Sequence, residues 1–152
     1  MKTHTTRVAL AAAPAVAAAI GGLGARNAAT VYPELRKPRW APPAGVFGPV
    51  WTALYVLVGV AGWRLTAHPL ARKILVLHLA QLTLNALWPH AFFARGRKPV
   101  SLAIIGALDV TLAAEVALAA REDPATAALL APYLAWCGFA TALNAAVEEP
   151  PV

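Results

Sequence analysis

Apolar residues fall into five long runs along the chain, and short polar segments separate most of them. The runs cover about residues 8–25, 45–63, 74–94, 99–120 and 125–147. Crossing a hydrocarbon core of about 30 Å takes roughly 20 apolar residues in a helix, and each run comes close to that length. Short connections make consecutive helices pack antiparallel. The pattern therefore predicts an all-α membrane protein, a five transmembrane helix bundle, with one domain over residues 1–152.

The first run has a second interpretation. Lys2 and Arg7 precede an Ala-rich core with several A-x-A sites, which is also typical of a secretory signal peptide. Small residues such as Ala11, Ala15 and Ala18 fit a retained helix, because membrane helices approach closely at small side chains. The residues alone leave both interpretations open. Six cations fall on one predicted side of the membrane and seven on the other, so the positive-inside rule gives no orientation.

Composition agrees with a membrane protein and excludes several other classes. Charged residues make up 13% of the chain and hydrophobic residues 59%, against about 25% charged in a soluble protein. The net charge of +6 is scattered between apolar runs, so no nucleic-acid surface is expected. The single cysteine excludes a thiolate metal cluster. His78 and His90 lie about 18 Å apart along one helix by helical rise, so they cannot clamp a haem iron. We expect no metal site, no obligatory cofactor and no catalytic motif of a hydrolase.

The connection over residues 26–44 is the only long one, and it is rich in proline and aromatic residues. Prolines at positions 33, 38, 42 and 43 prevent it from forming one continuous helix. Phe47, Trp51 and Tyr55 follow at i, i+4 and i+8, so they share one face of the next helix. The segment is either an interfacial linker or a stiff lid over a pocket that these three side chains open.

Two later helices carry polar and aromatic stripes. One consists of His78, Gln81, Asn85, Trp88 and Phe92, and the other of Tyr133, Trp136, Ala140 and Asn144. Amides are costly in hydrocarbon, so both stripes should face protein or a cavity, either for helix-to-helix hydrogen bonds or for a flat ligand. In the fourth run, Asp109 should be paired or protonated, because a carboxyl group is costly in the membrane. We expect structural pairing with a polar group, and a proton-relay or ion-pathway role is the alternative. Glu115 lies on a different face, where we expect partial access to solvent.

Three stretches together resemble a known family. They are Y-x-x-L-x-K-P-x-W-x-P-P-x-x-x-F-x-x-x-W-x-x-L-Y from Tyr32 to Tyr55, the run from Gln81 to Phe93, and the run from Pro132 to Asn144. In this order they are similar to the translocator protein family, also called TspO or tryptophan-rich sensory protein. Its eukaryotic members are known as peripheral benzodiazepine receptors.

The resemblance implies a ligand pocket between the helices beneath the first loop. It places Tyr32, Trp51, Asn85 and Trp136 in that pocket, and also Pro42, Phe47, Tyr55, Trp88 and Ala140. It implies tetrapyrrole ligands (protoporphyrin IX or haem), benzodiazepine-like small molecules and a homodimer. The activity it implies is porphyrin sensing, regulation or transport. The alternative is an enzyme-like, light-driven porphyrin degradation in which Trp51 and Trp136 take part.

The chain departs from the family pattern in two places. Val31 stands where the family usually has a tryptophan just before the loop tyrosine. The sterol motif of eukaryotic members needs an aromatic and a basic residue after the fifth helix, and none follows Asn144. We therefore expect no high-affinity sterol binding, and we expect a bacterial cell envelope membrane.

Overall fold

The computed structural model describes residues 2–65 and 71–148, and the rest of the predicted 1–152 domain lies outside the described residues. The described part is helical, and its β-structure is limited to one isolated bridge between Arg36 and Glu148. A 3-10 turn, Ala44–Val46, precedes the third helix, and a π-helical turn, His90–Ala94, ends the fourth. The helices are α1 (Lys2–Gly24), α2 (Ala28–Glu34), α3 (Phe47–Leu65), α4 (Ala71–Pro89), α5 (Lys98–Glu122) and α6 (Pro124–Ala146).

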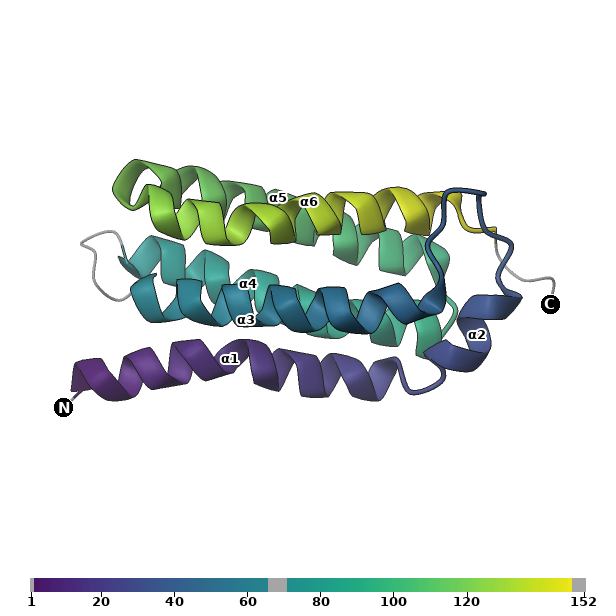
Figure 1. Cartoon of the computed structure of the whole chain (residues 1–152), viewed down its shortest axis with the longest axis horizontal. Coiled ribbons are helices and arrows are strands. Elements are labelled where there is room, and N and C mark those ends of the chain that lie inside the picture. The colour runs from purple at the N-terminus through teal and green to yellow at the C-terminus, as the bar shows by residue number, and fades with distance from the viewer. Residues whose placement is uncertain (1, 66–70, 149–152) are drawn as a thin grey trace.

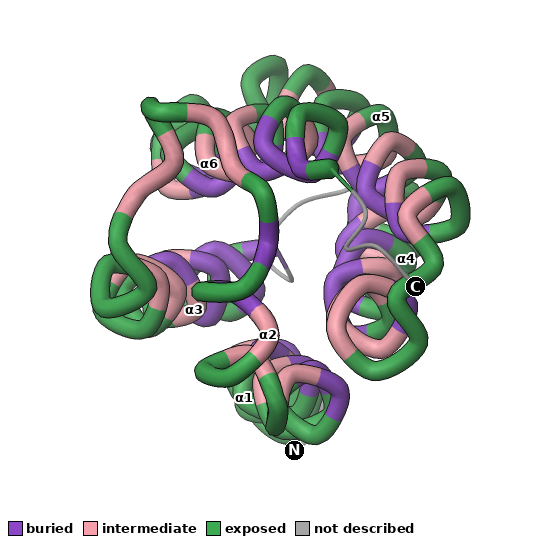
Figure 2. Tube along the Cα trace, turned by 90° about the vertical axis from the view of Figure 1, so that its right-hand side faces the viewer, coloured by how far each residue is buried: buried purple, intermediate pink, exposed green. Residues whose placement is uncertain are grey.

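Five long helices run side by side along the long axis, and the short α2 lies at one end of them (Figure 1). Around the bundle the packing order is α1, α3, α6, α5, α4 and back to α1. Figure 2 looks at the end where α2 lies and shows the helices as a ring, with buried positions turned inwards. This ring encloses the core and the candidate site.

Within the described residues, four helices are long and apolar enough to cross a membrane: α1, α3 with its preceding turn, α5 and α6. The predicted third crossing, α4, is not among these four. Its sequence is less apolar, because it contains Arg72 and Lys73 at its start and the inward stripe of His78, Gln81 and Asn85. Outward positions are apolar, with Val76 64% and Val110 72% exposed. Such a surface is suited to lipid, so the fold supports an integral membrane protein. A fifth crossing remains a prediction.

Glycines on α3 let α1 approach closely. A Cβ atom at Gly59 would lie 2.9 Å from the carbonyl oxygen of Ala11, and one at Gly62 would lie 2.6 Å from that of Leu10. Side chains at these two positions would push the helices apart. Membrane helices gain most of their association energy from such close packing, so the glycines fix how α1 sits in the ring.

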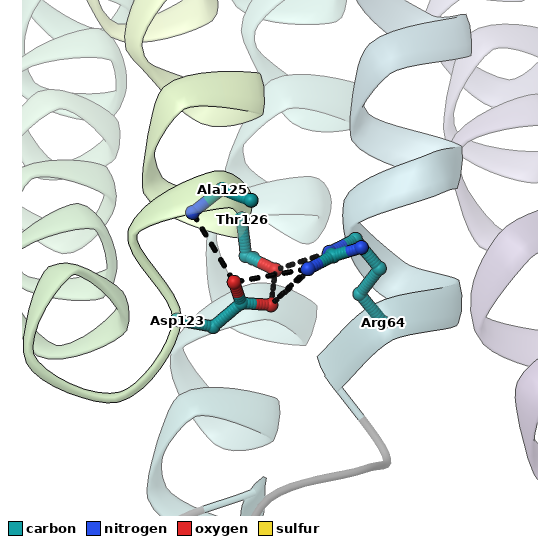
Figure 3. A network of polar contacts seen from close by, with 4 residues as sticks. All are labelled: Arg64, Asp123, Ala125 and Thr126. Atoms are coloured by element: carbon teal, nitrogen blue, oxygen red, sulfur yellow. Dashed lines mark hydrogen bonds and ion pairs between the residues drawn. The ribbon is translucent and has the colours of Figure 1, made fainter.

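A polar cluster joins α3 to the turn between α5 and α6 (Figure 3). The guanidinium of Arg64 donates to both carboxylate oxygens of Asp123 at 2.9–3.1 Å, and the Thr126 hydroxyl donates to the same carboxylate at 2.6 Å. Asp123 also caps α6 by accepting from the backbone N–H of Ala125 at 3.1 Å. These hydrogen bonds, that from Arg64 first, hold the pKa of Asp123 well below its usual range.

Three sequence predictions need correction. The first helix was predicted over about 8–25 but begins at Lys2, and the segment predicted as a long loop over 26–44 contains the short helix α2. The expected solvent access of Glu115 is wrong: its side chain is fully buried against His78. The helical period indicated that Glu115 and Asp109 lie on different faces of α5. It could not indicate that Glu115 has a partner on α4, because the period describes one helix at a time. Asp109 does have a polar partner, the hydroxyl of Thr141 at 2.6 Å.

A candidate ligand cavity beneath the first loop

A cavity of about 370 Å³ opens between the helices at the end of the bundle where α2 lies. Its walls come from every long helix, and α2 contributes to its cover. The volume lies at the lower end of the range for small-molecule sites, about 300–1,000 Å³. The lining is mostly apolar and aromatic, with few polar groups, as expected for a site that binds a flat organic ligand.

Aromatic rings from α3 and α6 form one wall. Trp51 stacks on Tyr55 one turn further along α3, with ring centroids 5.5 Å apart. Phe47 meets Trp136 of α6 edge to face at 5.9 Å. Edge-to-face and offset contacts at these distances are favourable for aromatic pairs, so the wall is held in place before any ligand arrives.

The end of α4 supplies a second aromatic group. Trp88 stacks on Phe92 at 5.1 Å, and Phe93 packs edge-on against Phe92 at 4.8 Å. Pro89 ends the regular helix, and the π-helical turn that follows carries Phe92 and Phe93. Because a π turn adds a residue to the repeat, both phenylalanines can line the cavity although they are adjacent in sequence.

The floor of the cavity is polar and centres on Asn85. Its Oδ1 accepts from the hydroxyl of Tyr55 at 2.7 Å, and its Nδ2 donates to the hydroxyl of Tyr133 at 3.0 Å. Further along, the indole N–H of Trp88 donates to Oδ1 of Asn144 at 2.8 Å. Within the described residues, Nε1 of Trp136 and Nδ2 of Asn144 are buried without a hydrogen-bond partner. Buried donors of this kind favour a ligand that can accept a hydrogen bond.

The first loop covers the cavity and is tied down at several points. The hydroxyl of Tyr32 donates to the carbonyl of Pro42 at 2.6 Å, so the loop is closed on itself across ten residues. The ring of Tyr32 packs edge-on against Phe47 at 5.1 Å. Arg36 meets Glu148 beyond α6 through a backbone hydrogen bond of 3.0 Å and a side-chain contact of 3.5 Å. The segment therefore packs as a cover over the cavity rather than as a detached linker.

The structure brings most of the predicted site residues to this one cavity. Eight of the nine line it: Tyr32, Phe47, Trp51, Tyr55, Asn85, Trp88, Trp136 and Ala140. Pro42 is not among the lining residues, and its part is to hold Tyr32. Asn144 and Phe92 also line the cavity, and the helical stripes contain the signal that could have selected them, since both continue the spacing of selected residues.

The wall formed by α1 and α2 was missed. It consists of small residues, among them Ala18, Gly21, Gly22, Ala25, Ala28 and Ala29. Small residues carry no chemistry that a sequence pattern can select. Their effect is spatial, because they leave room in front of the aromatic wall.

No group of three or more potential metal ligands occurs among the described residues. The basic residues of the loop lie outside the cavity lining. Lys37 donates to backbone carbonyls, including that of Leu35 at 3.0 Å, and Arg36 is engaged with Glu148. Arg39 is exposed on the loop. The arrangement can bind and orient a ligand, and it offers aromatic surface and hydrogen-bond donors rather than a nucleophile and base.

The fold and site define a helical integral membrane protein with an aromatic ligand cavity under a loop. Comparison with known proteins agrees: the model of the TspO/MBR family matches residues 9–149, and the chain belongs to this family. It is 35% identical over 113 residues to the tryptophan-rich sensory protein of Cereibacter sphaeroides, covering 74% of this chain and 72% of that one. It is 38% identical over 120 residues to the human translocator protein, covering 74% and 70%. The tryptophan-rich protein TspO of Archaeoglobus fulgidus is 34% identical over 126 residues, covering 81% of each chain. Because these relatives come from a bacterium, an animal and an archaeon, the bacterial envelope stays a prediction.

Proposed function

We propose that the protein binds tetrapyrroles, protoporphyrin IX or haem, in the cavity beneath the first loop, and acts in porphyrin sensing, regulation or transport. The observation that carries this proposal is the preformed aromatic cavity. Trp51, Trp88 and Trp136 from three different helices all line it. A planar macrocycle offers large faces for stacking on such rings, which is the interaction this lining supplies best.

The volume of the cavity and the charge of the loop above it agree with a ligand that is only partly enclosed. A tetrapyrrole is large for a cavity of about 370 Å³, so its edge would extend through the mouth towards the loop. Carboxylates on that edge would lie near the basic residues of the loop, of which Arg39 is exposed. Charge-assisted hydrogen bonds from a guanidinium are among the stronger ones in proteins. Smaller benzodiazepine-like molecules would fit inside the same walls.

A second candidate function is light-driven degradation of the bound porphyrin. The observation that favours it is that Trp51 and Trp136, two oxidisable indoles, both line the cavity. A photoexcited ring held against them would take an electron from an indole and pass it to molecular oxygen, which leaves an indole radical cation and superoxide, and oxygen is then the oxidant that breaks down the ring. This candidate predicts a new pigment, whereas sensing or transport leaves the ligand chemically unchanged.

The test is a titration of purified protein in detergent with protoporphyrin IX, followed by tryptophan fluorescence in the dark and by absorption spectra under light. We expect quenching in the wild type and weaker quenching and affinity in Trp51→Phe with Trp136→Phe. Trp63→Phe, at the far end of α3 and outside the cavity, is the matched control. Unchanged affinity in the double variant would show that the ligand binds elsewhere. A product spectrum that forms only under light and oxygen selects the enzyme-like candidate.

We also propose that α4 is a fifth crossing and that the protein forms a homodimer in the membrane. Support for the fifth crossing comes from the parallel course of α4 along the other long helices (Figure 1). With five crossings the two termini lie on opposite membrane faces, so reporter fusions at the two ends should give opposite signals. The family resemblance alone supports the dimer, and cross-linking in membranes tests it.

A further inference from the structure

A histidine and a glutamate meet inside the bundle, away from the cavity. His78 of α4 and Glu115 of α5 are both fully buried, and Nδ1 of the imidazole lies 2.6 Å from Oε1 of the carboxyl group. Neither residue lines the cavity. Burying two ionisable groups away from water destabilises a fold unless the groups are well paired.

The pair has remaining capacity for protons. Within the described residues, Nε2 of His78 and Oε2 of Glu115 are buried without a hydrogen-bond partner. Gly62 of α3 makes room for the imidazole, because a Cβ atom there would lie 3.2 Å from Nε2. An imidazole nitrogen and a carboxylate oxygen can each accept a proton. The fold thus buries two atoms that can accept a proton, Nε2 of His78 and Oε2 of Glu115. A hydrogen bond with a purely structural role would not require either of them.

A line of hydrogen bonds leads from this region to the cavity. Gln81 lies one turn from His78 on the inner face of α4, and its Oε1 accepts from the hydroxyl of Tyr133 at 2.8 Å. That hydroxyl accepts from Asn85, which accepts in turn from Tyr55. We call Gln81, Tyr133, Asn85 and Tyr55 the interior chain. Its last two members line the cavity.

Buried polar atoms without a partner connect the pair to the interior chain. In the described part of the protein, Nε2 of Gln81 has no hydrogen-bond partner, and neither have Nε2 of His78 and Oε2 of Glu115. A bound water between such groups is the usual way in which proteins satisfy them.

The other titratable groups on the helices around the pair have partners of their own or are exposed. On α6, Tyr133 and Cys137 are the buried ones, and Tyr133 belongs to the interior chain. Asp109 of α5 bonds Thr141, and Arg64 of α3 bonds Asp123. On α1, His4 and Arg7 both contact the ring of Trp63. Exposed charges on the pair's own helices are Arg72 and Lys73 of α4 and Arg121 and Glu122 of α5. The proton content of the pair therefore decides the charge at this point of the interior.

We propose that His78 and Glu115 form a buried proton-binding site coupled to the cavity through the interior chain. Resting on the proposed function, we further infer that an anionic tetrapyrrole draws an additional proton onto the pair. With one shared proton the pair is neutral. A second proton, taken from water, gives an imidazolium beside a protonated carboxyl group, a net charge of +1. Attraction between this charge and the ligand carboxylates at the mouth of the cavity acts through the interior, where the dielectric constant is lower than in water, and it weakens with their distance from the pair.

The first test uses the protein without ligand. Infrared difference spectra between two pH values should show a protonated-carboxyl band that disappears in Glu115→Gln and persists in Asp109→Asn, the matched control on the same helix. The chain has three asparagines, so ¹⁵N-asparagine labelling gives three side-chain amide signals. We expect the signal of Asn85 to move over the same pH range as the infrared band, and that movement to be lost in Glu115→Gln and in His78→Gln.

The second test adds ligand in weakly buffered solution with a pH indicator. Protoporphyrin IX should cause proton uptake, and its binding should tighten by up to about tenfold per pH unit as the pH falls. The uncharged dimethyl ester should show neither effect. Absence of the infrared band overturns the proton site, and an Asn85 signal that does not follow the band overturns the coupling. If neither porphyrin binds, the proposed function fails, whereas the ligand-free spectra still decide the proton site.

Discussion

The side chain of Asn85 lines the cavity and also contacts the buried interior of the bundle. It joins Tyr55 of α3 to Tyr133 of α6 through hydrogen bonds of 2.7 and 3.0 Å. The sequence predicted that Asn85 faces inwards, because amides are costly in lipid and its stripe has helical spacing. It could not predict the two tyrosines as partners, since they come from helices whose rotation about their axes is set by packing.

Replacement of Asn85 tests this role. Asn85→Leu keeps a similar volume but leaves the hydroxyls of Tyr55 and Tyr133 each without one partner. A buried polar group left unpaired costs about 1–3 kcal/mol, so we expect a loss of that order in the free energy of unfolding. The loss would be measured by denaturant titration in detergent. Thr83→Val is the control, because Thr83 is on the exposed face of α4 and bonds only the carbonyl of Leu79. Equal stability of the two variants would contradict the assignment.

At the scale of elements, the prolines of the first loop restrict its backbone. Tyr32 bonds Pro42 across the loop, and Leu35 packs against Leu143 and Val147 at the end of α6. Prolines reduce the freedom of the unbound segment, so little chain entropy is lost when it closes over a ligand.

Loosening the loop should therefore change ligand release. In Pro42→Gly with Pro43→Gly we expect faster dissociation of protoporphyrin IX and weaker binding, with the thermal midpoint of the ligand-free protein nearly unchanged. Stopped-flow measurement of the dissociation rate checks this. A dissociation rate equal to that of the wild type would remove the loop from the mechanism.

The turn between α5 and α6 gives a prediction about pH. The pKa of Asp123 is lowered in the folded protein, chiefly by Arg64, from an ordinary value of about 3.9. The ionised carboxylate therefore stabilises the folded state above that pH, and this contribution is lost as the pH falls through the lowered native pKa.

We accordingly expect Asp123→Asn to lower the thermal midpoint at pH 7, with a difference from the wild type that narrows as the solution is acidified. Asparagine can still cap α6, so the variant isolates the charge. Glu122→Gln, at the neighbouring exposed position, is the control. A difference that does not change between neutral and acidic pH would contradict the role of the carboxylate.

The sequence predicted the helices that coincide with long apolar runs. It did not predict the short helix or the π turn, which depend on local backbone geometry. Each of the five predicted runs contains a long helix in the described residues, and a crossing by α4 stays a prediction. The short α2 was missed, since the prolines argued against helix and Pro33 enters only its last turn. The π turn at His90–Ala94 was also missed, because nothing in the spacing of residues distinguishes it from the helix before it.

At the scale of the whole molecule, five helices form a ring, and the two ends of its interior contain different kinds of side chain. Towards the end where α2 lies, the ring holds the aromatic cavity, and deeper between α4 and α5 it holds His78 and Glu115. The sequence predicted the aromatic half from motifs. The buried pair could not be predicted, because its members lie 37 residues apart on helices that only the packing order brings together.

The central claim is that the cavity between the helices is the ligand site, and filling it is the most direct test. Ala140 of α6 lines the cavity, so Ala140→Trp would place an indole inside it. Val110→Trp adds the same side chain on the exposed face of α5 and serves as the control. We expect Ala140→Trp to raise the dissociation constant for protoporphyrin IX at least about tenfold, equivalent to about 1.4 kcal/mol, while Val110→Trp binds as the wild type does. Wild-type affinity in a folded Ala140→Trp variant would contradict the account.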